Sequence, residues 1–245
     1  MENNTKFHYL PFAIVLSAGI VIAAIILANT WGAVASRNVT ITVTGSASKE
    51  IRSDLAEWSA TFSNESSSLT EAYAKLKESN VKVKDYLISK GFEEGVLKFS
   101  AINTMNLYAT NTQGYKTDQI SGYRLSQEVT IESSDVDKID QLSREATELI
   151  NQGVEINSYQ PKFFYTKIGD LKVEMIGLAS EDAKLRAEQI AKSTGDDIGE
   201  VRSSRTGVIQ ITSKNSTEVS DYGINDTSSL EKKVTAVVSI SFSID

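Results

Sequence analysis

The pattern of apolar and polar residues divides the chain into a short apolar segment near its start and a long polar body. The apolar segment begins at Leu10, ends at Ala28 and contains no charged residue. At 1.5 Å per residue it forms a helix of about 28 Å, close to the roughly 30 Å hydrocarbon core of a bilayer. The pattern therefore predicts a transmembrane helix, and Trp31 follows it at a position that suits the membrane interface.

Three roles are open for this segment. Its length exceeds the usual apolar region of a secretory signal, which favours an uncleaved membrane anchor. Lys6 as a short basic region and Ala33-Val34-Ala35 as a cleavage site favour a signal peptide that is removed before Ser36. A buried core helix would need burial on every side, because the segment is apolar all round. We divide the chain into residues 1–36 (anchor or signal, and linker) and residues 37–245 (one domain).

The body begins with alternating patterns that predict strands at residues 39–44, 55–64 and 97–107. Gly45 is expected to end the first strand. A helix between the second and third strands has the spacing of a capping box from Ser68 and is followed by Gly91. The predicted apolar side of this helix consists of Leu69, Tyr73, Leu76, Val83 and Leu87.

The same pattern then repeats. Strands are predicted at residues 123–132 and 156–165, and the helix between them is opened by Ser134 and closed by Gly153. Pro161 favours a sheet edge for the second of these strands. The body thus contains two strand–helix–strand units, near residues 54–108 and 122–165.

A third helix is predicted at about residues 170–194, and alanine recurs in it at every fourth position: Ala179, Ala183, Ala187 and Ala191. Such a row of methyl groups allows a close approach, either to the domain's own sheet or to another subunit. Strands follow near residues 200–212 and 234–244. The predicted fold class is therefore α+β: an N-terminal transmembrane helix, then a body with two strand–helix–strand units, the alanine-rich helix and C-terminal antiparallel strands.

Two polar connections, residues 109–121 and 213–230, have the composition of loops, and loops of this length are often functional or mobile. The composition of the second favours disorder over much of its length. Tyr108, Tyr115 and Tyr222 are the candidate contact residues in or beside these connections.

Composition restricts the partners and the kinds of catalytic or metal centre that the body can have. The net charge of −7 argues against nucleic acid as a partner. The chain has no cysteine, and its single histidine, His8, precedes the apolar segment, so the body can hold neither a Ser-His-Asp nor a Cys-His centre nor a zinc site with histidine ligands. We expect no catalytic residue, no cofactor and no metal site. A hydrolase with a carboxylate pair would require two acids to converge in a cleft.

Several local strings, taken in order, resemble the SIMPL-domain family, which includes periplasmic immunogenic proteins of Gram-negative bacteria. These strings are Val43-Thr44-Gly45 with Ser53-Asp54, Lys90-Gly91, Gly122-Tyr123-Arg124, and the alanine-rich helix that runs into Gly195 and Gly199. The resemblance covers residues 39–245. Ala47 and Ser53 depart from it, at positions where glycine and proline are common.

The resemblance implies an α+β domain in the bacterial envelope, homo-oligomers that can be ring-like or channel-like, and a link to stress tolerance in some members. It implies no enzymatic activity. With the apolar segment, it predicts a single-pass protein of the cytoplasmic (inner) membrane, with its N-terminus inside and its body in the periplasm or outside the cell.

Two functions are therefore in view. The first is a membrane-anchored, exported envelope protein that self-assembles into a ring or channel-like structure, with further copies of itself and the lipid bilayer as its partners. The alternative is a periplasmic binding module that uses residues 109–121 and 213–230 to capture a small molecule or a protein whose identity is unknown.

Overall fold

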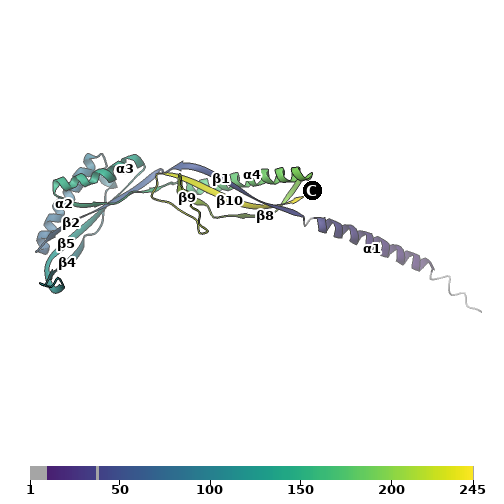
Figure 1. Cartoon of the computed structure of the whole chain (residues 1–245), viewed down its shortest axis with the longest axis horizontal. Helices are drawn as coiled ribbons and strands as arrows, with labels where there is room; N and C mark the ends of the chain where they lie inside the picture. Colours follow the sequence, from purple (N-terminus) through teal and green to yellow (C-terminus); the bar gives the residue numbers. More distant parts are fainter. Residues whose placement is uncertain (1–9, 37–38, 245) are drawn as a thin grey trace, which may run out of the picture. The chain divides into compact units, whose positions relative to one another are not determined.

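The computed structural model describes residues 10–36 and 39–244 and confirms a mixed α+β fold with an N-terminal apolar helix (Figure 1). The chain forms two compact units. Unit 1 comprises Met1–Ala47, Glu174–Val208 and Ala236–Asp245, and unit 2 comprises Ser48–Val173 and Ile209–Thr235. The elements β1, α4 and β10 contribute residues to both units.

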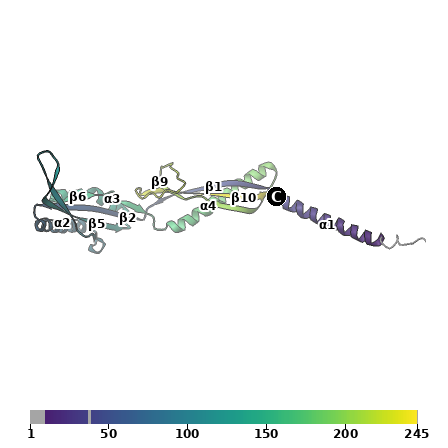
Figure 2. The same ribbon diagram turned by 90° about the horizontal axis from the view of Figure 1, so that it is seen from below.

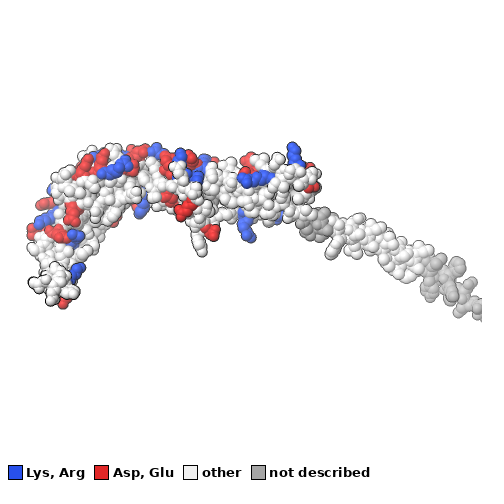
Figure 3. Space-filling model, in the orientation of Figure 1, with Lys and Arg blue, Asp and Glu red and all other residues white. Residues whose placement is uncertain are grey.

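The apolar helix α1 (Leu10–Ser36) is long enough to cross a membrane between Pro11 and Gly32. It carries no charged side chain, and its drawn surface is white in Figure 3. Trp31 is 79% exposed. These properties suit a membrane anchor and a signal sequence alike, and they exclude a core helix because the apolar window within Pro11–Gly32 is not buried. Lys6 and His8 lie outside the described residues.

Unit 2 contains a six-stranded sheet with the order β3-β5-β2-β6, in which β4 pairs with β5 and β7 pairs with β2. Every neighbouring pair in it is antiparallel. The central pair runs in register from Ala56 opposite Ser133 to Ser66 opposite Tyr123. The strands are β2 (Leu55–Ser66), β3 (Lys98–Phe99), β4 (Asn103–Thr110), β5 (Lys116–Ser133), β6 (Glu155–Ser158) and β7 (Lys162–Phe164).

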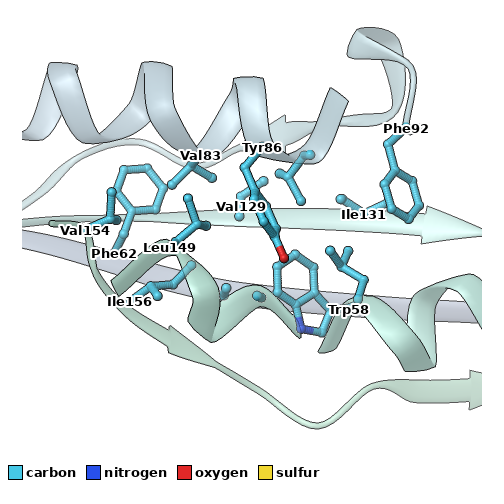
Figure 4. Close-up of a cluster of buried hydrophobic side chains, with 14 of the residues drawn as sticks. Trp58, Phe62, Val83, Tyr86, Phe92, Val129, Ile131, Leu149, Val154 and Ile156 are labelled. Atoms are coloured by element: carbon cyan, nitrogen blue, oxygen red, sulfur yellow. The ribbon is translucent and has the colours of Figure 1, made fainter. Parts of the chain in front are cut away.

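The helices α2 (Leu69–Ser89) and α3 (Val136–Glu145) and the 3-10 helix η2 (Ala146–Gln152) pack against this sheet, and a further 3-10 turn, η1 (Glu94–Val96), precedes β3. One face of β2 supplies the centre of the core because its alternate side chains are large and apolar. Figure 4 shows Trp58 and Phe62 of this strand beneath Val83 of α2. Burial of these side chains is the main stabilising contribution in unit 2.

The apolar side of α2 agrees with the prediction only in part. Leu69 and Tyr73 are 45% and 51% exposed, whereas Ala72 and Tyr86 are buried. The other predicted residues, Leu76, Val83 and Leu87, are buried as expected, because the sheet meets the helix on the side that they share with Ala72. Ser68 makes no capping hydrogen bond, so the predicted capping box is also wrong.

Several strand boundaries differ as well. The predicted strand at residues 97–107 is divided into β3 and β4, and Ser100 bonds to Glu128 between them. The predicted loop at residues 109–121 is mostly strand, since β4 ends at Thr110 and β5 begins at Lys116. Asp135, not Ser134, caps α3 by accepting from the Lys138 amide. Sheet pairing extends or interrupts these strands in ways that local composition does not report.

Unit 1 is built from parts of β1 (Thr40–Arg52), β10 (Glu231–Ile244) and α4 (Ile168–Thr194), together with β8 (Ile198–Thr206). The sheet has the order β1-β10-β8, and the short β9 (Gln210–Ser213) of unit 2 also pairs with β10. The strand predicted at residues 200–212 is thus two strands. Both β8 and β9 are antiparallel to β10. Figures 1 and 2 show α4 running alongside β1 and β10.

The strand β1 does not end at Gly45, contrary to the prediction, because this glycine serves a close contact rather than a turn. A Cβ atom at Gly45 would lie 2.7 Å from Ala183 Cα and closer still to the Ala179 carbonyl oxygen and the Ala183 amide. The backbone of α4 therefore rests directly on β1. Of the alanine row, Ala179, Ala183 and Ala187 are fully buried and Ala191 is 1% exposed within one chain, so the row faces the domain interior.

Asp182 reinforces this crossing. Its carboxylate accepts hydrogen bonds from the Ser46 amide and from Arg186 Nε, both at 2.8 Å. The Ser46 bond is the main reason that the pKa of Asp182 is lowered from 3.8. A carboxyl with a depressed folded-state pKa stabilises the fold above its unfolded pKa, and this contribution disappears as the pH falls through the folded value.

We therefore expect Asp182→Asn to lower the melting temperature at pH 6, and we expect the melting temperatures of this variant and the wild type to converge as the pH falls through the lowered pKa of Asp182. Thermal unfolding monitored by circular dichroism across this range measures both effects. Asp118→Asn, at an exposed position of β5, is the control. A difference between Asp182→Asn and wild type that is the same at every pH would contradict the assignment.

Candidate functional site

The outer edge of β1 is an open pairing surface of unit 1. In the described chain no strand pairs with β1 on the side opposite β10. Residues 40–47 of this edge contain no charged side chain and no proline, which are the residues that usually protect an edge from pairing. The edge therefore offers an unprotected row of backbone donors and acceptors.

The direction of these groups follows from the register. The Val39 carbonyl accepts from Ile244, so Val39 faces β10 and the amides of Thr40, Thr42 and Thr44 face outward, because alternate residues of an antiparallel strand bond to the same neighbour. The Ser46 amide, next in this outward series, is taken by Asp182. Only the part of the edge before Ser46 is thus open for pairing.

A shallow groove follows the same edge. It has a volume of about 500 Å³ and is lined by residues 42–44 of β1 and by Arg186, Gln189 and Ile190 of α4. Ile190 is 46% exposed there. The open edge is thus accompanied by a partly apolar surface that side chains of an added strand could occupy.

The sheet has a second open edge on β8, since no described strand pairs with β8 on the side away from β10. Val201 opposes the buried Phe242 of β10 in the register, so both side chains lie on the face that α4 covers. Val201 is nevertheless 57% exposed. Arg202 and Arg205 place charges along this edge.

The three candidate tyrosines do not form one site. Tyr108 and Tyr115 lie in the β4–β5 hairpin and are 45% and 68% exposed, and Tyr222 is 97% exposed in the connection after β9. This connection bonds to Phe163, which pairs with Ala56, whereas the hairpin extends past Ser66.

The separation follows from strand geometry. The stretch of β2 from Ala56 to Ser66 spans about 33 Å at the usual rise per residue. A small molecule cannot contact both connections at once.

The second connection, predicted to be largely disordered, is tied to its surroundings. Thr227 accepts from the Phe163 amide at 2.7 Å, Leu230 accepts from the Ser53 amide at 3.0 Å, and Asp226 donates its amide to Ile211 at 2.9 Å. Gln210 Nε2 donates to the Ser220 carbonyl at 2.7 Å. These bonds hold residues 220–230 against β7 and β9.

A buried lysine in unit 2 was not identified from the sequence. Lys232 is 2% exposed, and its ammonium donates to the carbonyls of Phe163 (3.0 Å) and Asp226. Burial lowers its pKa, which the charge of Asp226 partly offsets. The sequence did contain a signal for it. Lys232 is one of the alternate residues of β10 that point into the protein, as Val234 and Ala236 do. A charged residue at a buried position of a strand indicates that polar partners surround it, because charged side chains are rarely buried without partners.

Within residues 10–36 and 39–244, no group of three or more histidine, cysteine, aspartate or glutamate side chains is arranged to hold a metal ion.

Comparison with protein-family models matches residues 41–242 to the model SIMPL, described as "Protein of unknown function (DUF541)". The match spans both units and every strand from β1 to β10. A comparison with curated proteins found no match.

Proposed function

Because the chain belongs to the SIMPL family, we propose that it is a membrane-anchored, exported envelope protein that assembles with copies of itself through the open edge of β1. The observation that carries the proposal is the uncharged, unpaired edge at residues 40–45, together with the groove beside it. Natural sheets rarely leave such an edge unprotected unless it pairs with another chain.

The anchor reading of α1 supports this proposal. Only residues 37–39 separate the end of α1 from the start of β1, so the open edge begins within about 14 Å of the membrane helix. Anchored copies share one membrane and one orientation, which raises the effective concentration of their edges. Weak strand pairing between neighbouring copies then becomes sufficient for assembly.

The two open edges favour a head-to-tail arrangement. Contacts of Val39 with Ile244 and of Thr42 with Ser241 run in opposite directions along the strands, so β1 is antiparallel to β10. Since β8 is also antiparallel to β10, β1 and β8 run the same way. The β8 edge of one copy can therefore meet the β1 edge of the next, with its exposed Val201 beside Ile190 in the groove.

A head-to-tail contact repeats around a rotation axis and forms a ring when the rotation closes. Copies that share one membrane can be related only by an axis normal to it. We therefore propose a ring-like assembly in the periplasm or outside the cell, anchored in the cytoplasmic membrane of a bacterium. Its role is structural or channel-like and not enzymatic.

The substitution Thr44→Lys tests the edge. Thr44 is exposed on the open part of β1, and lysine is a residue with which natural edge strands avoid pairing. We expect the full-length protein, extracted in detergent, to be oligomeric by light scattering, and we expect Thr44→Lys to raise its dissociation concentration at least tenfold.

Thr104→Lys is the matched control, because Thr104 is also an exposed threonine on an edge strand, β4 in unit 2. It should leave the mass unchanged. A strictly monomeric wild type at high concentration would falsify the proposal, and so would a folded Thr44→Lys variant with the wild-type mass.

A further inference from the structure

A cavity of about 120 Å³ in unit 2 brings together two groups of opposite charge. Its apolar wall is formed by Phe163 and Phe164 of β7, Ile168 at the start of α4 and Ile211 of β9. Its polar lining comes from Lys232 and from residues 225–227 of the connection after β9. All of these residues belong to unit 2.

The first charged group, the Lys232 ammonium, has one more N–H donor than it has described acceptors. An ammonium carries three N–H donors. Two of them bond to the carbonyls of Phe163 and Asp226, and for the third no acceptor is found among the described residues. The side chain is 2% exposed, so bulk water does not replace the missing acceptor. A buried donor without a partner costs free energy.

The second charged group, the Asp226 carboxylate, has hydrogen-bond donors on only one of its two oxygens. Its Oδ1 accepts from the amide and the hydroxyl of Ser228, at 2.8 and 2.7 Å. Its Oδ2 is buried, and no described hydrogen bond within 3.5 Å reaches it. Burial raises the pKa of Asp226, but the neighbouring side chains of Ser229 and Ser228 outweigh it and lower the pKa below 3.8, so the carboxylate is ionised at neutral pH.

The two charged groups do not satisfy each other. Among the described residues, the salt bridges within 4.0 Å do not include one between Lys232 and Asp226, although the charge of Asp226 acts on Lys232. A molecule that fills the space between them must supply an acceptor for the ammonium and a donor for Oδ2. If it also carries both charges, it enters without adding net charge to a buried site.

We propose that this cavity binds a small α-amino acid with an apolar side chain, with its carboxylate on Lys232, its ammonium on Oδ2 of Asp226 and its side chain against Phe163 and Ile211. The cavity of about 120 Å³ exceeds the roughly 10–15 Å³ that one water needs, so it has room for more than a single water. The site involves Asp226 of the second connection but none of the three tyrosines. It lies in unit 2, and the proposed assembly edge lies in unit 1.

Equilibrium dialysis of the detergent-solubilised full-length protein against radiolabelled valine tests the proposal. We expect saturable binding of one valine per chain. Isobutylamine lacks the carboxylate of valine, and isovalerate lacks its ammonium. Each should displace the label at least tenfold less effectively than unlabelled valine, because each leaves one of the two buried charges without its partner.

Two variants and one control assign the site. Lys232→Met removes the ammonium and keeps an unbranched side chain, and Asp226→Asn keeps an acceptor for Ser228 while it removes the charge. Both should weaken valine binding at least tenfold. Lys233→Met is the matched control, because Lys233 bonds instead to the Ser216 carbonyl at 2.8 Å and does not line the cavity. It should bind valine as the wild type does.

Three results would overturn the proposal: no saturable binding of valine, which would mean that the cavity holds water only; equal displacement by valine and isobutylamine; or wild-type binding in folded Lys232→Met. If Lys232→Met does not fold, Asp226→Asn and the displacement series on the wild type decide the question. Light scattering on the same samples reports assembly separately, so failure of valine binding is distinguishable from failure of the edge contact.

Discussion

Gly45→Ala is expected to destabilise unit 1 by about 3 kcal/mol, the upper end of the usual cost of overpacking. The added methyl group would lie 2.7 Å from Ala183 Cα and closer to the Ala179 carbonyl oxygen and the Ala183 amide. All three are backbone atoms, which cannot rotate away as a side-chain end can. Relief requires α4 to move from β1, and that movement would also break the bond between Asp182 and the Ser46 amide.

Gly177→Ala provides the matched control, because it makes the same chemical change on an exposed face of α4 with no atom within 4 Å of the new methyl group. Alanine is the better helix former there, so Gly177→Ala should stabilise the protein by up to about 1 kcal/mol. Differential scanning calorimetry of the full-length variants compares the two. Equal responses of the two glycines to alanine would show that the contact between α4 and β1 is not what requires glycine.

Leu76→Ala is expected to destabilise unit 2 by about 3 kcal/mol, within the range for a leucine removed from a packed core. Leu76 is 1% exposed and belongs to the cluster that contains Phe62 and Val83. The cost combines the lost transfer of the side chain from water with the cavity that remains, and it depends on how far α2 can settle toward the sheet.

Leu69→Ala on the same helix is the control, since Leu69 is 45% exposed. We expect a change of less than about 1 kcal/mol. Urea unfolding followed by tryptophan fluorescence measures both variants, in a Trp31→Phe background that leaves the buried Trp58 as the only reporter. A similar loss in the two variants would mean that Leu69 packs against the sheet as Leu76 does.

These two leucines also show what a sequence pattern can predict. The spacing of apolar residues identified α2 as a helix, because helical periodicity is a local property. It identified the buried face only in part. Leu76, Val83 and Leu87 are buried as predicted, but Ala72 and Ser79 are buried too, whereas Leu69 and Tyr73 are exposed. Which face is buried depends on where the sheet lies, and no local pattern contains that information.

Strand ends were predicted less well than strands. Gly45 and the polar hairpin around Tyr115 were both expected to interrupt the sheet, because glycine and polar runs are typical of turns. In the structure β1 continues through Gly45, and β4 and β5 extend almost to the hairpin tip. Backbone pairing stabilises a strand whatever its composition, once a partner strand is in register.

The two candidate sites likewise depend on contacts that a local sequence pattern does not contain. The open β1 edge could not be read from its sequence, because an edge strand and a central strand of this composition look alike until their neighbours are known. The cavity at Lys232 left one trace, a lysine in the apolar phase of β10. Its counterpart Asp226 left none, because the connection that carries it is brought to Lys232 only by the contacts of Thr227 and Leu230.

The sequence by itself determined the apolar helix, the family, the α+β class and the lack of cysteine and body histidine, because these are properties of composition and of short-range order. Only the tertiary structure decided that α4 crosses β1 at Gly45, that the uncharged first part of β1 lies at a sheet edge, and that Lys232 and Asp226 line one cavity. The physical reason is that burial, strand pairing and the separation of charges depend on residues that are far apart in the chain.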